Sequence, residues 1–115
     1  MITVDFFQNE DGALLGFQSE GHADAGEYGY DIVCSAITAL TINTVNAIEK
    51  LTVAQFEEET DEKGGFLKVI LDTGSERNPD AQLLLKTLLL GITQMADNYP
   101  DNIRIRHIER QNYGR

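Results

Sequence analysis

The sequence predicts an α+β fold, in which two helices pack on a mostly antiparallel sheet and the elements follow the order ββαββαβ. Short alternating apolar segments, which suit strands, lie on either side of two longer segments with helical periodicity. The length of 115 residues suits a single domain over 1–115, and 42% hydrophobic residues suit a globular core.

The chain is expected to begin with a β-hairpin. Residues 2–6 alternate apolar and polar side chains, residues 9–12 have turn composition, and residues 13–20 have the pattern of a second strand. This strand runs directly into Gly21 and His22. We therefore expect His22 at a strand end, where catalytic groups are often held.

A loop and a long helix are expected next. Residues 24–30 contain two glycines and no hydrophobic periodicity, which is typical of a loop. Helical periodicity runs from about Ile32 to about Leu51, with Asp31 as the N-cap and Cys34 in the first turn. The face expected to pack on the sheet comprises Val33, Ile37, Leu40, Ile48 and Leu51.

The junction between this loop and the helix has the residues of a catalytic site. Cys34 is the only cysteine, and His22 is one of two histidines. Free amides at a helix start favour a thiolate over a thiol and can hold an oxyanion. A histidine brought alongside could stabilise the thiolate and protonate a leaving amine, and Asp31 could orient its ring as well as cap the helix. The alternative is that Cys34 is a small buried hydrophobic residue.

The second half of the chain predicts two more strands. Residues 56–60 are β-like, residues 61–65 form a turn, and residues 66–72 give the clearest strand, with Leu67, Val69 and Leu71 facing the core. Three consecutive glutamates at 57–59 alternate between the faces of a strand and do not converge on a metal. A solvated sheet edge is the favoured interpretation.

A second helix is expected after a polar linker at 73–77, with Asn78 as its cap and Pro79 at its first position. Its leucines spread around the circumference, so it needs burial on more than one side. A homodimer would supply that burial; the alternative is cover by the first helix and the sheet.

A last strand is expected over 102–107, where Arg104 and Arg106 share a face and pair at the surface.

Charge and composition narrow the function. The net charge is −10, which disfavours direct binding of nucleic acid and favours a basic partner. One cysteine and two histidines are too few for a typical metal site, and no phosphate-binding glycine fingerprint occurs, so we expect no cofactor. We find neither a run of about 18 apolar residues nor a signal-peptide pattern, which predicts a cytoplasmic protein without a membrane span.

The residues around the cysteine resemble a known family. Gly21-His22-Ala23, a glycine loop and Gly29-Tyr30-Asp31-Ile32-Val33-Cys34-Ser35-Ala36 are similar to the ribosomal-processing cysteine proteases called Prp, and the resemblance covers the whole chain. It implies that His22 and Cys34 are the catalytic pair, assisted by Asp31 and by the Thr38 hydroxyl. Ser35 and Thr38 depart from the family's usual alanine and serine.

The resemblance also implies a homodimer and a substrate, the basic N-terminal extension of bacterial large-subunit ribosomal protein number twenty-seven. This leader would end in an aromatic pair before a small residue. We expect a substrate loop to close over it, with Gly26 and Gly29 as hinges and Tyr28 or Tyr30 against the aromatic side chains. The loop would be flanked by Gly21 and Ala23. The alternative function is a non-catalytic, acidic, dimeric module that binds a ribosomal protein as an assembly factor.

Overall fold

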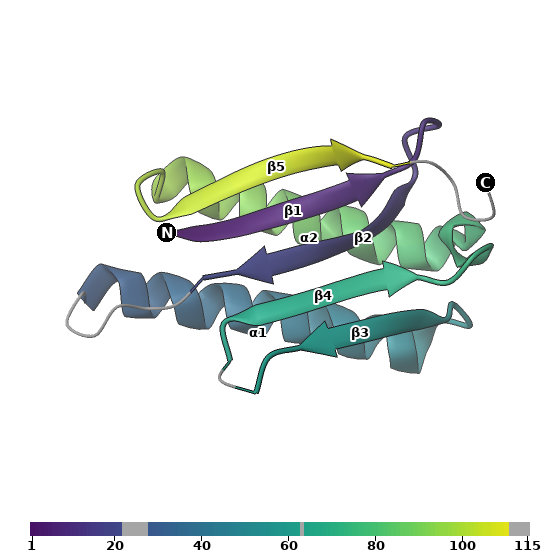
Figure 1. Cartoon of the computed structure of the whole chain (residues 1–115), viewed down its shortest axis with the longest axis horizontal. Coiled ribbons are helices and arrows are strands. Elements are labelled where there is room, and N and C mark those ends of the chain that lie inside the picture. Colours follow the sequence, from purple (N-terminus) through teal and green to yellow (C-terminus); the bar gives the residue numbers. More distant parts are fainter. Residues whose placement is uncertain (22–27, 63, 111–115) are drawn as a thin grey trace.

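The structure, a computed structural model, describes residues 1–21, 28–62 and 64–110, and at 28–31 it describes the backbone alone. Its elements are β1 (Ile2–Gln8), β2 (Leu14–Glu20), α1 (Tyr28–Leu51), β3 (Phe56–Thr60), β4 (Phe66–Leu71), a 3-10 helix (Ser75–Arg77), α2 (Pro79–Asn98) and β5 (Ile103–Glu109). The strands form one sheet in the spatial order β3-β4-β2-β1-β5 (Figure 1). The predicted order ββαββαβ is confirmed.

Antiparallel pairing dominates the sheet, as predicted. Among the described strands, β1–β2, β2–β4 and β3–β4 pair antiparallel, while β5 returns beside β1 in parallel. The β1–β2 turn is held by Asn9, whose side-chain oxygen accepts hydrogen bonds from the amides of Asp11 and Ala13. This bonding satisfies turn amides that the sheet ladder leaves free.

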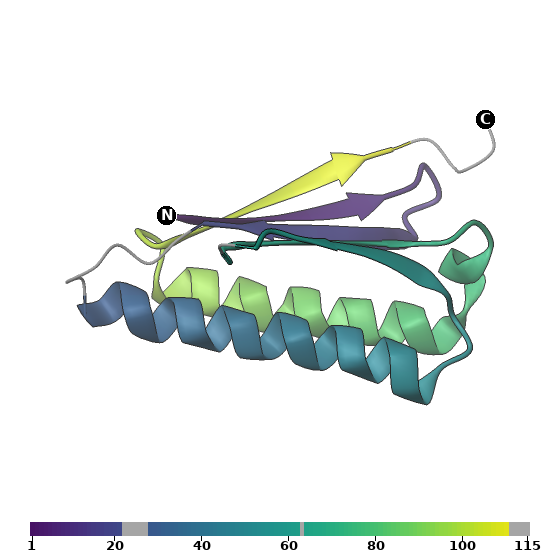
Figure 2. The same cartoon turned by 60° about the horizontal axis from the view of Figure 1, so that its bottom comes forward.

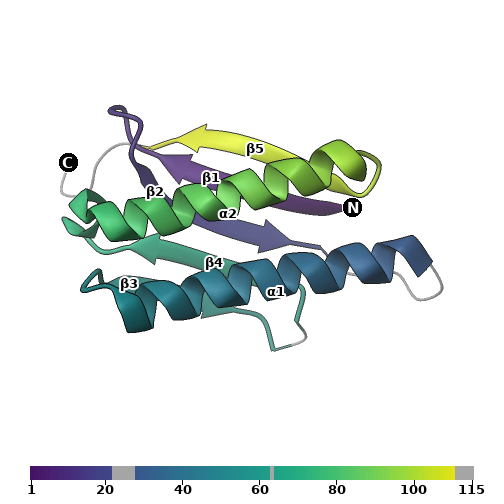
Figure 3. The ribbon, with the colours of Figure 1, turned by 180° about the vertical axis from the view of Figure 1, so that it is seen from behind.

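Both helices cover the same face of the sheet (Figure 2). They lie side by side and run in opposite directions (Figure 3). The core between the two layers includes Phe6 and Phe17, whose ring centroids are 6.4 Å apart. The three β4 residues predicted to face the core, at 67, 69 and 71, are all buried. Each fully buried side chain of this size contributes roughly 1.5–3 kcal/mol.

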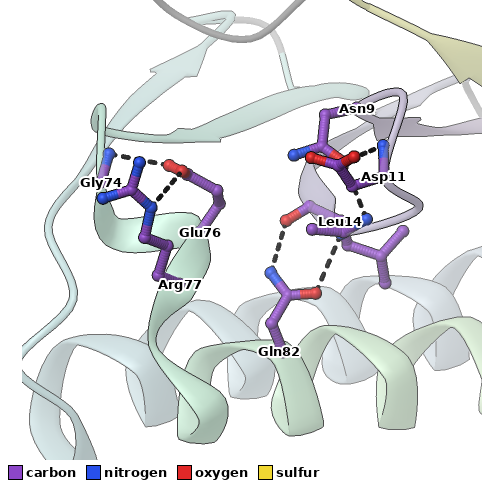
Figure 4. Close-up of polar contacts among 8 residues, drawn as sticks. Asn9, Asp11, Leu14, Gly74, Glu76, Arg77 and Gln82 are labelled. Carbon is purple, nitrogen blue, oxygen red and sulfur yellow. Dashed lines mark hydrogen bonds and ion pairs between the residues drawn. The ribbon is translucent and has the colours of Figure 1, made fainter.

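The amide of Gln82 fixes α2 to the hairpin. Its Nε2 donates to the Leu14 carbonyl at 2.7 Å, and its Oε1 accepts from the Leu14 amide at 2.9 Å (Figure 4). The helix starts as predicted: Pro79 is its first residue, and the Asn78 side chain accepts from the Ala81 amide at 2.8 Å. Just before it, the Glu76 carboxylate accepts from the Gly74 amide (Figure 4).

The sheet and α1 cover one side of α2. Its buried residues are Ala81, Leu85, Leu88 and Ile92. Leu83 and Leu90 remain 63% and 59% exposed on the opposite side of the helix. Cover by α1 and the sheet therefore accounts for one side of α2, and the predicted homodimer stays a prediction.

One helix of the described chain, over Ile32–Leu51, is long and apolar enough to cross a membrane by length and composition. Sequence reasoning did not find this stretch. It is weak support for a membrane segment, because the core helix of a globular protein passes the same criterion. Val33, Ile37 and Ile48 of this helix are buried in the core, as predicted. Leu51 was wrongly assigned to that face: it is 73% exposed, because the helix ends there.

Candidate active site

The helix that carries Cys34 begins earlier than predicted. It starts at Tyr28 rather than Ile32, so Asp31 lies within the first turn and is not the N-cap. The prediction failed because aspartate is favoured throughout a first turn, where its charge complements the helix dipole, as well as at the cap. Local sequence therefore marked the start of this helix only to within a turn.

Cys34 accordingly lies in the second turn of α1, not in the first. The effect of the helix dipole fades beyond the first turn, and an amide at this position already bonds to the carbonyl four residues before it. The prediction that Cys34 lies in the first turn is therefore wrong. Stabilisation of a thiolate by the helix start, and of an oxyanion by backbone amides near Cys34, stays a prediction.

Cys34 is partly buried and lines a cleft of about 220 Å³. The cleft lies between α1 and the end of the sheet where β2 finishes and β4 begins, and α1 extends beyond the strands on this side (Figure 1). One flank of the cysteine packs against the hydrophobic core. The interpretation of Cys34 as a fully buried residue is wrong, since part of its side chain is accessible to a ligand in the cleft.

Gly21 lines the same cleft. Its amide donates to the Gly65 carbonyl at 2.9 Å, and its φ is +144°. A Cβ at this position would lie 2.6 Å from the Met1 carbonyl oxygen and 2.9 Å from the Ile2 Cα. Only glycine fits this close approach to the start of β1. The residue directly before His22 is therefore held at the rim of the cleft that contains Cys34.

The other predicted site residues are described in part or not at all. His22, Ala23 and Gly26 lie outside the described residues. For four further candidates the structure describes the backbone alone, namely Tyr28, Gly29, Tyr30 and Asp31. Thr38 lies one turn after Cys34 on α1, and both line the cleft. The structure thus brings Cys34, Thr38 and Gly21 together.

Sequence reasoning missed the apolar walls of the cleft. Ile2 and Leu67 are buried there, and the more exposed walls are Ile42 of α1 and Phe66 at the start of β4. Helical spacing could have found Ile42, which follows Cys34 at i+8. No local sequence pattern placed Phe66 at the cleft, because the start of β4 comes near α1 only through tertiary packing.

The charges near the cleft are acidic. Asp61 is the charged residue among the described ones that line it. The three glutamates at 57–59 are exposed on the adjacent edge strand β3, which confirms the predicted solvated edge. His107, the histidine among the described residues, is exposed on β5 at the opposite edge of the sheet, in register with Phe6.

A shallower groove of about 570 Å³ continues from the cleft along the outer side of α1. Cys34, Thr38 and Ile42 line both hollows, whereas Ala39 and Asn46 belong to the groove alone. An extended peptide lying across the helix would therefore pass Cys34 with room on either side. This arrangement can present a peptide bond to a cysteine sulfur.

A family model described as cysteine protease Prp matches residues 1–104 of the chain. The chain belongs to the Prp family of cysteine proteases. The ribosomal processing cysteine protease Prp of Staphylococcus aureus is 39% identical over 108 residues, which cover 93% of this chain and 99% of the relative.

Two crystal structures of S. aureus Prp share the fold. The complex with a covalently linked product peptide has a TM-score of 0.84 and 37% identity, covering 93% of this chain and 99% of that chain. The complex with a substrate peptide has a TM-score of 0.85, 36% identity and the same coverage. The chain is therefore a cysteine protease with the α+β fold of Prp. A non-catalytic binding module, the alternative from the sequence, does not fit a member of this family.

Proposed function

We propose that this Prp protease removes the N-terminal extension of bacterial large-subunit ribosomal protein number twenty-seven, with Cys34 as the nucleophile and His22 as the general acid and base. The observation that carries the proposal is the position of Cys34 in a cleft whose rim is formed by Gly21, the residue before His22. We infer that His22, as the residue joined to Gly21, serves this cleft, because a general acid and base must come within hydrogen-bond reach of the group it serves.

In the proposed reaction, the Cys34 thiolate attacks the scissile carbonyl carbon, and its oxygen becomes an oxyanion. The C–N bond then breaks, His22 transfers a proton to the leaving amine, and the acyl group remains on the sulfur as a thioester. Water, activated by His22, hydrolyses the thioester and regenerates the thiol. The covalently linked product peptide in S. aureus Prp supports a mechanism through a covalent intermediate.

The supporting roles of the other candidate residues belong to the same proposal. Thr38 shares both hollows with Cys34, so its hydroxyl is within reach of a bound peptide and can donate to the carbonyl oxygen. Asp31 would orient the His22 ring. Gly26 and Gly29 would let the loop close over the leader, with Tyr28 or Tyr30 against aromatic side chains of the substrate.

The acidic character of the protein supports a basic ribosomal substrate. The net charge of −10 and the exposed glutamates beside the cleft would attract a positively charged extension and raise the encounter rate. The S. aureus relative is described as a ribosomal processing protease. Charge supports the class of substrate, and the individual ribosomal protein is the part of the proposal that the experiment must establish.

We further propose that the enzyme acts as a homodimer. Leu83 and Leu90 lie two helical turns apart on the side of α2 that faces away from the sheet, and both are more than half exposed. These two exposed apolar side chains would be buried if the same face of a second copy packed against them, as a two-fold interface requires.

The decisive experiment is incubation of the protein with the uncleaved ribosomal protein, followed by mass spectrometry. The expected result is loss of the N-terminal extension, abolished by Cys34→Ala. Ser35→Ala is the matched control, since the neighbouring hydroxyl is not the proposed nucleophile, and this variant should cleave normally. Continued trimming by the Cys34→Ala variant, or an intact substrate with the unmodified enzyme, would refute the proposal.

A further inference from the structure

The strand β3 forms one edge of the sheet, and its pairing with β4 shows which of its backbone groups face outward (Figure 1). The Asp72 amide donates to the Gln55 carbonyl at 2.8 Å, and these two residues continue the register in which Phe56 pairs with Leu71. Bonded pairs recur at every second residue of an antiparallel ladder. The residues of β3 that bond inward to β4 are therefore Glu57 and Glu59, and those whose amides and carbonyls point outward are Phe56, Glu58 and Thr60.

This outer edge can accept another strand. Among the described residues, none forms a hydrogen bond with the outward amides and carbonyls of β3. The register with β4 runs through all five residues without a bulge, and β3 contains no proline. Bulges and prolines are two common ways to protect an exposed edge from pairing. On β3 the protection comes from exposed carboxylates, which repel an acidic strand and leave a basic one free to pair.

The carboxylates lie on both faces of the sheet. Glu58 lies opposite Val69, which is buried in the core between the sheet and the helices. Successive side chains of a strand alternate between its faces, so Glu57 and Glu59 lie on the face without helices. All three glutamates are exposed. A hollow of about 280 Å³ is lined by Glu58 and by Glu49 of α1, and a second hollow of about 310 Å³ is lined by the glutamates of β3.

The cations beside these glutamates have another partner. Lys68 and Arg110 also line the second hollow, but their charged groups lie over the Phe7 ring, at 5.8 and 5.2 Å from its centroid. Among the described salt bridges, none includes a glutamate of β3. These carboxylates are therefore available to lysine or arginine side chains of a partner.

The edge leads to the site of the reaction. Thr60, the last residue of β3, lines the cleft that contains Cys34. The five residues of β3 correspond to about 17 Å of extended chain. A polypeptide that pairs along this edge would therefore reach the cleft at the Thr60 end.

We propose that the outer edge of β3 binds an extended, basic segment of the substrate as an additional strand, outside the cleft. The outward backbone groups of β3 pair with the main chain of this segment, and the glutamates on the two faces pair with its lysine or arginine side chains. The inference rests on the proposed function, because the segment at the edge and the bond cut at Cys34 belong to one substrate.

The first test measures binding to the Cys34→Ala variant, which requires no catalysis. The probe is a fluorescent, lysine-containing peptide that spans the cut in the ribosomal protein, N-methylated at each backbone amide in turn. Methylation should weaken binding about 5-fold or more at every second residue of a stretch beyond the cleft, because each of these amides loses a hydrogen bond to β3. Uniform tolerance, or loss confined to the residues next to the cut, would overturn the inference.

The second test changes the edge itself. Glu58→Pro removes an outward amide and leaves the inward bonds of β3 to β4 in place. The ratio of kcat/KM for the long peptide over a short peptide that reaches only the cleft should fall about 5-fold or more, because main-chain bonds to the edge are lost. Thermal unfolding checks that this variant keeps its fold. An unchanged ratio in a folded variant would overturn the inference.

A pair of variants tests the charges without altering the backbone. Glu57→Gln combined with Glu58→Gln should lower kcat/KM for the lysine-containing peptide and have little effect on the same peptide with glutamine in place of lysine. Asp97→Asn combined with Asp101→Asn removes the same charge near the end of α2 and is the control, which should preserve the preference for lysine. Equal effects of the two pairs would indicate long-range attraction alone and would overturn binding at the edge.

These outcomes separate the inference from the proposed function. Cleavage without an alternating pattern and without an effect of Glu58→Pro would remove the edge as a binding surface and leave the protease reaction in place. Alternating binding to Cys34→Ala without cleavage by the unmodified enzyme would support the edge and refute the proposed reaction. A change of molecular mass in Glu58→Pro would identify the edge as a contact between two copies and overturn the inference.

Discussion

Arg106 and Asp5 form a two-pronged ion pair across neighbouring parallel strands. Arg106 Nε and Nη2 donate to the two carboxylate oxygens of Asp5 at 2.7 and 2.8 Å. The Asp5 side chain is only 5% exposed, whereas that of Arg106 is 54% exposed. The pair joins β1 to β5, the last strand of the chain, and gives a reason for an acidic residue inside β1.

Replacing Arg106 by methionine should lower the midpoint of urea unfolding, because the Asp5 carboxylate then remains buried without its partner. Arg104→Met is the matched control, since Arg104 is an exposed arginine on the same strand and has no comparable buried partner among the described contacts. Asp5→Asn combined with Arg106→Met should recover part of the lost stability. Equal effects of the two single arginine variants would contradict this role of the pair.

The contribution of the Arg106–Asp5 pair to the free energy of unfolding should change little with pH. The hydrogen bond to Asp5, followed by the Asp5 charge, raises the pKa of Arg106 above its ordinary value. Stability from a raised pKa is fully present below the unfolded value and is lost only as pH rises through the folded value. The difference in unfolding free energy between Arg106→Met and the unmodified protein, taken from urea titrations, should therefore stay constant from about pH 6 to about pH 10.

Gly21→Ala should impair both stability and cleavage. The new Cβ would collide with backbone atoms of residues 1 and 2, at a φ that suits glycine. We expect a loss of about 2 kcal/mol or more in urea unfolding and at least about a 10-fold fall in kcat/KM, because the shift moves the residue joined to His22. Gly12→Ala is the control: its φ is also positive, but nothing lies within 4 Å of its added Cβ. Gly12→Ala should lose some stability and keep its activity; equal loss of activity in both variants would disprove this role of Gly21.

Alkylation of Cys34 should depend on His22. Because the cysteine lies in the second turn of α1, the helix start contributes little, and an imidazole is the remaining candidate to favour the thiolate. His22→Asn should slow iodoacetamide labelling near pH 7 by about 10-fold or more, as measured by mass spectrometry over time. His107→Asn should leave the rate unchanged, since His107 lies on the far edge strand. No slowing in His22→Asn would remove His22 as the partner of the sulfur.

Gln82→Ala should destabilise the protein without touching the site. The substitution removes both hydrogen bonds to the backbone of Leu14, and neutral bonds of this kind contribute about 1 kcal/mol each. A fall of roughly 5–15 °C in Tm is expected by calorimetry. Gln94→Ala, at an exposed glutamine of the same helix, should change Tm little. Similar Tm values for the two variants would show that the two hydrogen bonds between Gln82 and Leu14 do not stabilise the protein.

The proposed dimer contact at Leu83 and Leu90 of α2 can be tested by measuring the molecular mass in solution. Light scattering after gel filtration should give twice the monomer mass for the unmodified protein and the monomer mass for the Leu83→Lys and Leu90→Lys double variant, because charge at the centre of an apolar interface is costly. Val53→Lys, at an exposed apolar residue outside α2, should remain dimeric. A monomer mass for the unmodified protein would refute the proposed dimer.

The sequence by itself determined the order of the elements, the buried face of β4 and the start of α2, because these follow from local signals: alternation, turn residues and the Asn78-Pro79 cap. It also supplied the residues that mark the family. It misplaced the start of α1, since an aspartate suits the cap and the first turn alike.

Only the tertiary structure decided that Gly21, Cys34, Ile42 and Phe66 border one cleft, and that Asp5 meets Arg106. These residues lie far apart along the chain, and no local pattern records which strand neighbours which. The register of β5 against β1 and the packing of α1 on the end of the sheet bring them together. The candidate cysteine was therefore identifiable from the sequence, whereas the walls of the cleft around it arose only from the packing of the layers.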